Sequence, residues 1–329
     1  MDTLETLTQQ IMDGHQVTRE EALWLSKQPL EHLCRQADRI RRHFCKNTFD
    51  LCTIINGKSG RCSENCKFCA QSAHNHTDAD TYPLLSKEEI LADAKKQAAQ
   101  GILRYSIVTA GKALSDEEID IMCGTIRQIR QETTLSVCVS FGLLTESQFR
   151  RLKDAGVSRV HNNLETSERH FPNICTTHTF ADKVSAIQAA QQAGLTVCSG
   201  GIMGMGETMA DRIDMALALR GLGITSVPVN VLNPIPGTPF GEYPTLSEAE
   251  VLRILALYRF LLPAASIRMA GGRGLLPDGG KSCFLSGANA AITGDMLTTA
   301  GITVQTDLQM LTELGYEVKL DETTDGHRH

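Results

Sequence analysis

Short runs of aliphatic and β-branched residues alternate with longer amphipathic segments from residue 50 onward. Runs with β-branched residues are typical of strands, and apolar positions recurring every three to four residues are typical of helices. Repeated strand-then-helix units predict a parallel sheet with crossover helices. The eight predicted strands are Asp50–Asn56, Leu103–Thr109, Leu135–Ser140, Ser158–Leu164, Thr196–Ile202, Ser226–Leu232, Ser266–Ala270 and, with the weakest pattern, Asn289–Thr293.

The intervening helices begin at recognisable caps, in which Ser or Thr is followed three residues later by an acidic residue. These pairs are Ser86 with Glu89, Ser115 with Glu118, Thr179 with Asp182, and Ser247 with Glu250. Eight strands alternating with helices predict the α/β class and a (β/α)8 TIM-type barrel. In such barrels the chemistry gathers where the strands end.

The barrel is expected to occupy residues 49–320, because no low-complexity tract or long Pro/Gly linker divides 50–310. Residues 1–48 are expected to form an N-terminal helical cover, with Thr18 and Glu21 as a capping box. The polar tail 321–329 is expected to be flexible.

Composition narrows the function classes. The chain has 329 residues, of which 42% are hydrophobic and 21% charged, and a formal net charge of −6 without basic blocks. This balance argues against a nucleic-acid partner and favours a small-molecule substrate. No apolar run approaches the length of a membrane span, and the polar start MDTLETLTQQ is not a signal peptide. We therefore expect a cytoplasmic protein without a membrane partner.

Eleven cysteines in such a chain are expected to be thiols or metal ligands rather than disulfides. Cys62, Cys66 and Cys69 form a C-x3-C-x2-C triad on the loop after the first predicted strand. An electron-transfer [4Fe–4S] site takes four cysteines, so three leave one iron open to a small molecule. A structural zinc site also needs four ligands, which His74 or His76 could complete. Cys34, Cys45 and Cys123 lie in helix-like stretches and, like Cys175, receive no role here.

The triad resembles the signature of the radical S-adenosylmethionine (SAM) enzymes, in which the amino and carboxylate groups of SAM chelate the open iron. Phe68 matches the aromatic residue that this family places beside the adenine. Strand four ends in HNNLETS, which puts an amide and a carboxylate two residues apart, although strand-end capping is an alternative reading. The loop from Gly200 to Glu207 fits the family pattern G-x-I-x-G-x-x-E.

The order and separation of five segments narrow the resemblance to the biotin synthases. These segments are CSENCKFCAQS, HNNLETS, VCSGGIMGMGET, SVPVNVLNPIPGTP and IRMAGGRG. The resemblance implies sulfur insertion between C6 and C9 of dethiobiotin, with two SAM molecules consumed per biotin. It also implies an electron donor such as flavodoxin or ferredoxin, cluster-assembly proteins as partners, and a homodimer.

Individual roles follow from the same resemblance. Glu165 would hold the SAM ribose, and Lys183, where the family usually has arginine, would meet the SAM carboxylate. A lysine offers a point charge in place of the bidentate guanidinium fork. Asn163 and Asn230 match substrate-binding positions. The remaining SAM-binding positions are Phe68, Gly200, Ile202 and Gly204.

The chain departs from its family at a second, sulfur-donating [2Fe–2S] cluster. Cys138, Cys198 and Arg268 match three of its ligands, but the remaining cysteine position on strand two is Ser106. A serine hydroxyl is a poor replacement for a thiolate on iron. Cys52 on strand one stands where better-known members carry serine. We expect Cys52, Cys138 and Cys198 to ligate an auxiliary cluster, either with two irons or with more.

Other ligands and functions stay open at this stage. Arg268 and Cys283 are possible further ligands, and Cys52 could instead be a packed core thiol. Another radical SAM enzyme of the same barrel, such as a methylornithine synthase or hydrogenase maturase, is an alternative function. A non-catalytic iron–sulfur carrier is a second alternative, but it would have no use for Glu165 or the glycine loop.

Overall fold

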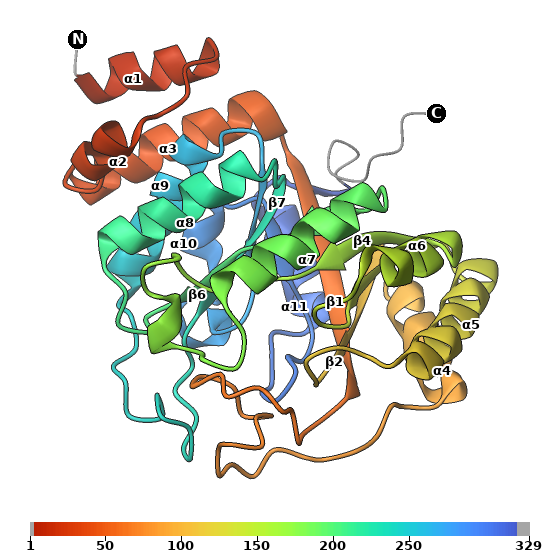
Figure 1. Cartoon of the computed structure of the whole chain (residues 1–329). Coiled ribbons are helices and arrows are strands. Elements are labelled where there is room, and N and C mark those ends of the chain that lie inside the picture. Colours follow the sequence, from red (N-terminus) through yellow and green to blue (C-terminus); the bar gives the residue numbers. More distant parts are fainter. Residues whose placement is uncertain (1–2, 321–329) are drawn as a thin grey trace.

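The computed structural model describes residues 3–320, in which parallel strands alternate with helices (Figure 1). The strands are β1 Thr48–Lys58, β2 Arg104–Thr109, β3 Ser136–Ser140, β4 Val157–His161, β5 Thr196–Cys198, β6 Gly201–Met203, β7 Ser226–Val231, β8 Ser266–Met269, β9 Ala290–Ile292 and β10 Glu317–Val318. The helices are α1 Thr3–Met12, α2 Arg19–Leu25, α3 Leu30–Cys45, α4 Lys87–Ala99, α5 Asp116–Glu132, α6 Glu146–Asp154, α7 Phe180–Gln192, α8 Met209–Gly221, α9 Glu248–Leu261, α10 Lys281–Phe284 and α11 Val304–Glu313.

The sheet closes on itself. Its order runs from β1 through β5 to β7, β8 and β9, and β9 pairs again with β1, so that Asp50 lies opposite Ala290. Pairing is parallel throughout, and β6 continues the fifth strand position against β7. The predicted (β/α)8 barrel is therefore confirmed, including its weakest strand near residue 290. The short β10 lies outside the barrel and pairs with the start of β1.

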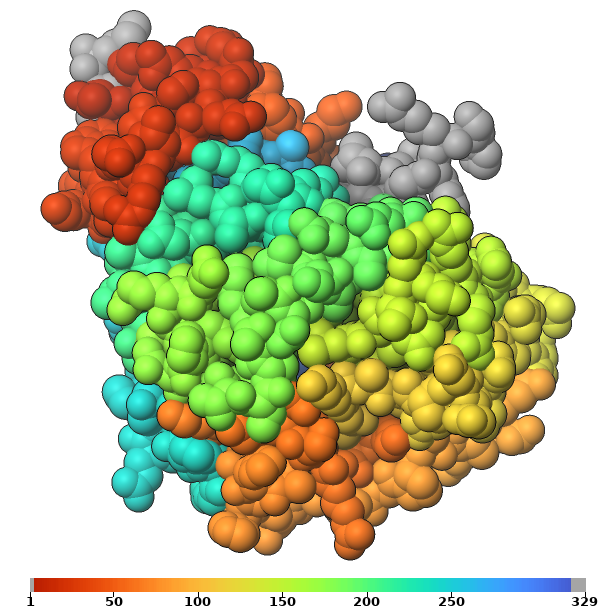
Figure 2. Space-filling model, viewed as in Figure 1, coloured from red at the N-terminus to blue at the C-terminus, as the bar shows by residue number. Residues whose placement is uncertain are grey.

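Alternation along each strand separates two environments. Tyr105 and Ile107 of β2 are fully buried in the apolar layer beneath the helices, whereas Arg104 and Ser106 face a cavity inside the barrel. The four predicted helix caps are capping boxes in the structure, at the starts of α4, α5, α7 and α9. Figure 2 shows side chains of α5 to α8 covering most of the strands on one face.

The fifth strand differs from the prediction. Thr196–Ile202 was expected to be continuous, but it is two short strands with the same register against β7, separated at Ser199 and Gly200. Pro228 of β7 stands opposite this interruption. Because proline has no backbone N–H, it cannot donate to the ladder there.

Gly200 also marks a close backbone approach. A Cβ atom at this position would lie 1.9 Å from the carbonyl oxygen of Pro228. We expect Gly200→Ala to destabilise the protein by about 1–3 kcal/mol, the usual cost of overpacking a core. Urea denaturation should show this loss. Gly221→Ala is the matched control, since a Cβ there meets nothing within 4 Å. Equal stability of the two variants would contradict the prediction.

The N-terminal helices pack on the barrel wall. α3 contacts α9, α1 contacts α3, and α2 contacts α8. Figure 1 shows these helices and the long loop after β1 at opposite ends of the molecule. No helix within residues 3–320 combines the length and apolarity needed to cross a membrane. The predicted flexible tail, 321–329, lies outside the described residues.

Candidate functional site: a cavity that joins the triad loop to buried cysteines

A cavity of about 350 Å³ runs from the interior of the barrel to the loops at the carboxyl ends of the strands. Inward side chains of all eight strand positions line it, together with the end of the triad loop and residues 296–299. The sequence-predicted residues that line it are Cys52, Phe68, Cys69, Cys138, Asn163, Glu165, Cys198, Ile202, Asn230 and Arg268. The cavity therefore connects the two groups of residues that the sequence suggested separately.

Three thiols line the deep part of the cavity. Cys52, Cys138 and Cys198 come from β1, β3 and β5 and are each at most 5% exposed. Arg268 Nη1 donates to Cys52 Sγ over 3.4 Å, and Ser226 Oγ donates to Cys198 Sγ over 3.3 Å. The structure thus brings together the three cysteines and the arginine that the sequence assigned to the auxiliary cluster.

The thiols differ in acidity. Burial opposes ionisation of Cys198, but a hydrogen bond from His161 and the nearby guanidiniums outweigh it and lower the pKa of Cys198 to about 6. Burial raises the pKa of Cys138 to about 12, and burial likewise raises the pKa of Cys52. Of these three thiols, Cys198 is therefore the one that most readily binds a metal as thiolate.

A buried charge cluster underlies the cysteines. Asp50 forms ion pairs with Arg104 and Arg268, each at 3.0 Å, and with Arg159 at 3.8 Å. Burial opposes ionisation of Asp50, but the three guanidiniums outweigh it and keep its pKa well below the usual range. The guanidinium of Arg268 also contacts Cys52 Sγ, so it would favour an anionic thiolate or a sulfide-containing cluster beside it.

Ser106 stays at the wall of this site. It lies opposite Cys138 in the β2–β3 register and is 5% exposed. Cys52 pairs with Arg104 and is therefore one inward position deeper than Ser106. Cys283 is placed elsewhere: it does not line the cavity and is fully buried in the apolar core at α10. We accordingly leave Cys283 out of the proposed ligand set.

The triad loop is held by its own backbone. Cys62 N donates to Gln71 O, and Cys69 N donates to Cys66 O. Asn75 Nδ2 donates to the carbonyl oxygens of Cys66 and Cys69, over 3.2 and 2.8 Å. The three cysteines are partly exposed, and Cys69 lines the cavity, whereas Cys62 and Cys66 do not. Such a fixed, accessible set of three soft donors fits a cluster with one open iron.

Glu165 lies near this mouth in an unusual conformation. Its φ of 71° is left-handed, and its backbone N–H and carbonyl bond to Gly200 and Ile202. A Cβ on Gly201 would lie 2.3 Å from the Glu165 carbonyl oxygen, so a larger residue is excluded there. Burial raises the pKa of Glu165, and its carboxylate accepts from Asn163 Nδ2 over 3.3 Å. A carboxylate so placed can bind a diol.

The other predicted ligand-binding residues have clear structural partners. Asn230 donates to Gly201 O over 3.1 Å and accepts from Gly271 N over 2.9 Å. The side-chain amide of Asn230 therefore keeps one further N–H and one further lone pair for a ligand. Lys183 and the backbone at Gly200 and Gly204 do not line the cavity, and Lys183 Nζ donates to Asn162 Oδ1 over 3.2 Å.

Several residues of the site were not identified from the sequence. They are Asp50, two residues before Cys52; Arg104, two residues before Ser106; and Arg159 and His161, which are two residues apart on β4. Their signal in the sequence was the presence of charged or titratable residues inside strand-like runs. Glu207 was read only as part of a pattern. It accepts from Gly204 N and Met205 N, over 2.8 and 2.7 Å, and so fixes the glycine loop.

Comparison with known proteins agrees with these groupings. Residues 28–219 match the Radical SAM superfamily, and residues 228–317 match the Biotin and Thiamin Synthesis associated domain. Biotin synthase of Brachyspira hyodysenteriae is 58% identical, with 97% of this chain and 96% of that protein covered. Biotin synthase of Akkermansia muciniphila is 57% identical, with 97% and 100% covered. These matches confirm the resemblance seen in the five segments.

Solved structures show the same fold at low sequence identity. Methylornithine synthase superposes with a TM-score of 0.83 at 20% identity, covering 95% of this chain and 97% of that one. The [FeFe]-hydrogenase maturase of Carboxydothermus hydrogenoformans gives 0.81 at 17% identity, covering 95% and 78%. With more than half of its residues identical to biotin synthases over nearly its whole length, this chain is an enzyme of the biotin synthase family within the radical SAM superfamily.

Proposed function

We propose that this enzyme inserts sulfur between C6 and C9 of dethiobiotin to give biotin. The observation that carries the proposal is the continuous cavity, which connects Cys69 at its mouth with Cys52, Cys138 and Cys198 at its base. A substrate between the two groups would have a radical source on one side and a sulfur source on the other. When bound, a [4Fe–4S] cluster with SAM and an auxiliary cluster supply the carbon-centred radical and the sulfur atom.

The residues at the mouth of the cavity would hold the [4Fe–4S] cluster and SAM. Cys62, Cys66 and Cys69 would ligate the cluster, Phe68 would pack beside the adenine of SAM, and Glu165 would bind the ribose hydroxyls. The glycine loop would approach the adenosine through its backbone, because Glu207 holds the N–H groups of Gly204 and Met205 in place. Lys183 would reach the SAM carboxylate after leaving Asn162.

The residues along the cavity would position dethiobiotin. Asn163 and Asn230 carry amide groups that match the donors and acceptors of a ureido ring. The lining includes Ile54, Val108 and Ile292, and these side chains exclude water from the reacting carbon atoms. Exclusion of water protects a carbon-centred radical from side reactions.

The base of the cavity would hold the auxiliary cluster. Cys52, Cys138 and Cys198 would be its thiolate ligands, and the buried guanidiniums around Asp50 would offset part of the charge of thiolates and sulfide. Arg268, which already contacts Cys52, would approach the cluster from β8. Ser106 lies at the wall of the site but offers no thiolate. Elemental analysis would give the number of irons in this cluster.

Partners and location follow from the same proposal. A one-electron donor such as flavodoxin or ferredoxin and cluster-assembly proteins would serve the two clusters, and a homodimer is proposed on family grounds. The eleven cysteines are free thiols in the structure, so a reducing compartment such as the cytoplasm suits them.

Anaerobic incubation with SAM, a reductant and dethiobiotin tests the function directly. Mass spectrometry should detect biotin together with methionine and 5′-deoxyadenosine. Omission of dethiobiotin is the control and should remove biotin from the products. Formation of 5′-deoxyadenosine without any biotin would show that the enzyme cleaves SAM for another substrate.

Glu165→Gln should weaken SAM binding and slow its cleavage. A hydrogen bond to a charged group contributes about 1.5–3 kcal/mol, so we expect a loss of about tenfold to a hundredfold in 5′-deoxyadenosine formation at low SAM. Glu168→Gln, an exposed carboxylate on the same loop, is the matched control. If both variants keep wild-type rates at low SAM, Glu165 does not bind the ribose.

A further inference from the structure

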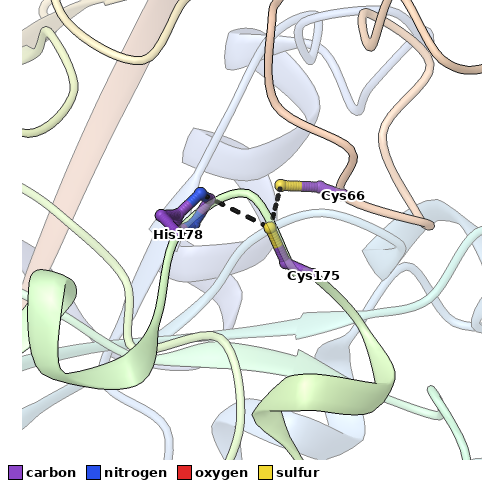
Figure 3. A group of neighbouring side chains, drawn as sticks. All are labelled: Cys66, Cys175 and His178. Atoms are coloured by element: carbon purple, nitrogen blue, oxygen red, sulfur yellow. Dashed lines mark hydrogen bonds between the residues drawn. The ribbon is translucent and has the colours of Figure 1, made fainter.

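An unassigned thiol lies against the triad. Cys175, on the loop after β4, has its Sγ 3.7 Å from Cys66 Sγ, although 109 residues separate them (Figure 3). Cys175 is 2% exposed and belongs to an apolar group with Phe171, Ile174 and Leu232, against which Cys66 packs. Within the described residues, Cys66 is therefore the triad residue with a hydrogen bond to a sulfur from outside the triad.

Backbone contacts between the two loops fix this approach. Lys67 N donates to Ile174 O over 2.9 Å, next to both cysteines. Asn65 Nδ2 donates to Thr176 Oγ1 over 2.6 Å, and its N–H donates to Thr177 Oγ1 over 3.1 Å. The position of Cys175 beside Cys66 is thus set by the fold of both loops.

The direction of the sulfur–sulfur hydrogen bond follows from metal ligation. The structure gives this hydrogen bond from Cys66 Sγ to Cys175 Sγ. Once it is bound to iron, Cys66 is a thiolate and can only accept. With Cys66 ligated, Cys175 must therefore remain a thiol and donate, since a second thiolate at 3.7 Å would repel the first.

Thr177 Oγ1 lies 3.5 Å from Cys175 Sγ and already donates to Glu64 Oε2. Two further acceptors around Cys175 are also already used. Asn65 Oδ1 is 3.4 Å from Cys175 Sγ but accepts from the backbone N–H groups of Thr176 and Thr177, over 2.9 and 3.2 Å. His178 Nδ1 is 3.4 Å from the same sulfur and 2.5 Å from Glu64 Oε2, to which it donates its proton. A charged thiolate is a stronger acceptor than either, so Cys66 receives the S–H of Cys175.

We propose that the Cys175 thiol donates a hydrogen bond to the iron-bound sulfur of Cys66 and raises the reduction potential of the SAM cluster. Reduction adds negative charge to the cluster and its sulfur ligands, so the hydrogen bond is stronger in the reduced state. The apolar surroundings increase this difference because they screen it weakly. The proposal rests on the proposed function, in which Cys62, Cys66 and Cys69 hold that cluster. Cys175 acts through Cys66 and is a positioning residue.

A single metal ion is the competing use of these residues. One ligand atom each from Cys66, Cys175 and His178 lie within 4.8 Å of one another, a spacing that a zinc ion could bridge. Such an ion would remove Cys66 from the triad and leave only two cysteines for the cluster. Metal analysis therefore separates the two uses.

The test compares reduction potentials in the reconstituted full-length enzyme. Cys175→Ala and Cys175→Val remove the donor, Cys175→Ser keeps an O–H donor, and Cys123→Ala removes a buried thiol on α5 away from the site. Potentials are measured by anaerobic titration, following the electron paramagnetic resonance signal that changes when SAM is added. That criterion separates the SAM cluster from the auxiliary cluster.

In the two donor-free variants we expect the reduction potential of the SAM cluster to fall by about 59 mV. For one electron, this corresponds to an about tenfold higher ratio of oxidised to reduced cluster at a given applied potential. Cys175→Ser should recover most of the shift, and Cys123→Ala should leave the potential unchanged. Wild-type potentials in both donor-free variants would overturn the proposal without affecting the function. Zinc bound by wild-type protein and lost in Cys175→Ala would also overturn it. Wild-type enzyme without a SAM-responsive cluster would instead overturn the proposed function.

Discussion

Replacing Cys52 with alanine should abolish biotin formation while SAM cleavage continues. The variant should lose the iron and sulfide of the auxiliary cluster and keep those of the SAM cluster. We expect biotin formation to fall more than about 100-fold, because losing even a supporting partner of a metal ligand costs about 10–100-fold. Elemental analysis of anaerobically purified protein and product analysis by mass would measure both effects.

The reason lies in the geometry of the barrel base. Cys52 lines the same cavity as Cys138 and Cys198, and the guanidinium of Arg268 contacts its sulfur. Ser106 lies on the neighbouring strand, one inward position nearer the mouth than Cys52, and has no thiolate to offer. Inward residues of a closed barrel converge on one axis, so a ligand can move from β2 to β1 and still reach the same cluster.

Cys283→Ala is the control, because this thiol is equally buried but lies in the apolar core outside the cavity. The Cys283→Ala variant should keep both clusters and lose only the packing contacts of the Cys283 side chain in the apolar core. If Cys52→Ala retained wild-type iron and sulfide, Cys52 would be a packed core thiol and the auxiliary site would need another ligand. If Cys283→Ala lost auxiliary iron, the proposed ligand set would be wrong.

Asp50→Asn should cause a large loss of stability. Asp50 is a buried carboxylate that forms ion pairs with three buried guanidiniums at the barrel base. Removing one partner of a buried ion pair leaves uncompensated charge and costs about 3–5 kcal/mol. Anaerobic urea denaturation of the cluster-free protein should show a lower free energy of unfolding by that amount.

A surface ion pair supplies the control. Asp214 contacts Arg19 at 2.6 Å, but both side chains are more than one third exposed. Asp214→Asn should therefore change stability by about 1 kcal/mol or less. If Asp50→Asn were no more destabilising than Asp214→Asn, the guanidiniums would not depend on Asp50 for charge compensation.

Asp50 and the arginines at the barrel base affect the ionisation of the neighbouring cysteines. The carboxylate of Asp50 forms ion pairs with three buried arginines, and their guanidiniums favour the anionic state of a nearby thiol. The lowered pKa of Cys198 is one visible consequence, since Arg268 and Arg159 contribute to it after His161. The cysteines and the charge cluster are therefore electrostatically coupled.

Local patterns were enough to predict the fold and the chemistry of the mouth. Strand and helix periodicity, with capping boxes at Ser86, Ser115 and Ser247, depends on neighbouring residues and predicted the barrel correctly. The triad and the glycine loop are also contiguous segments, so their chemistry was readable without the fold. The break at Gly200 was not, because its cause is Pro228 on the adjacent strand.

By itself the sequence determined the eight-stranded barrel, the family and the set of cysteines available for iron. Tertiary structure decided which of them share a space. Closure of the barrel brings Cys52 to the same cavity as Cys138 and Cys198, leaves Cys283 in the core, and gathers Asp50 with its arginines. It also sets Cys175 against Cys66. These are contacts between residues far apart in the chain, and only the closed sheet and its loops bring such residues within bonding distance.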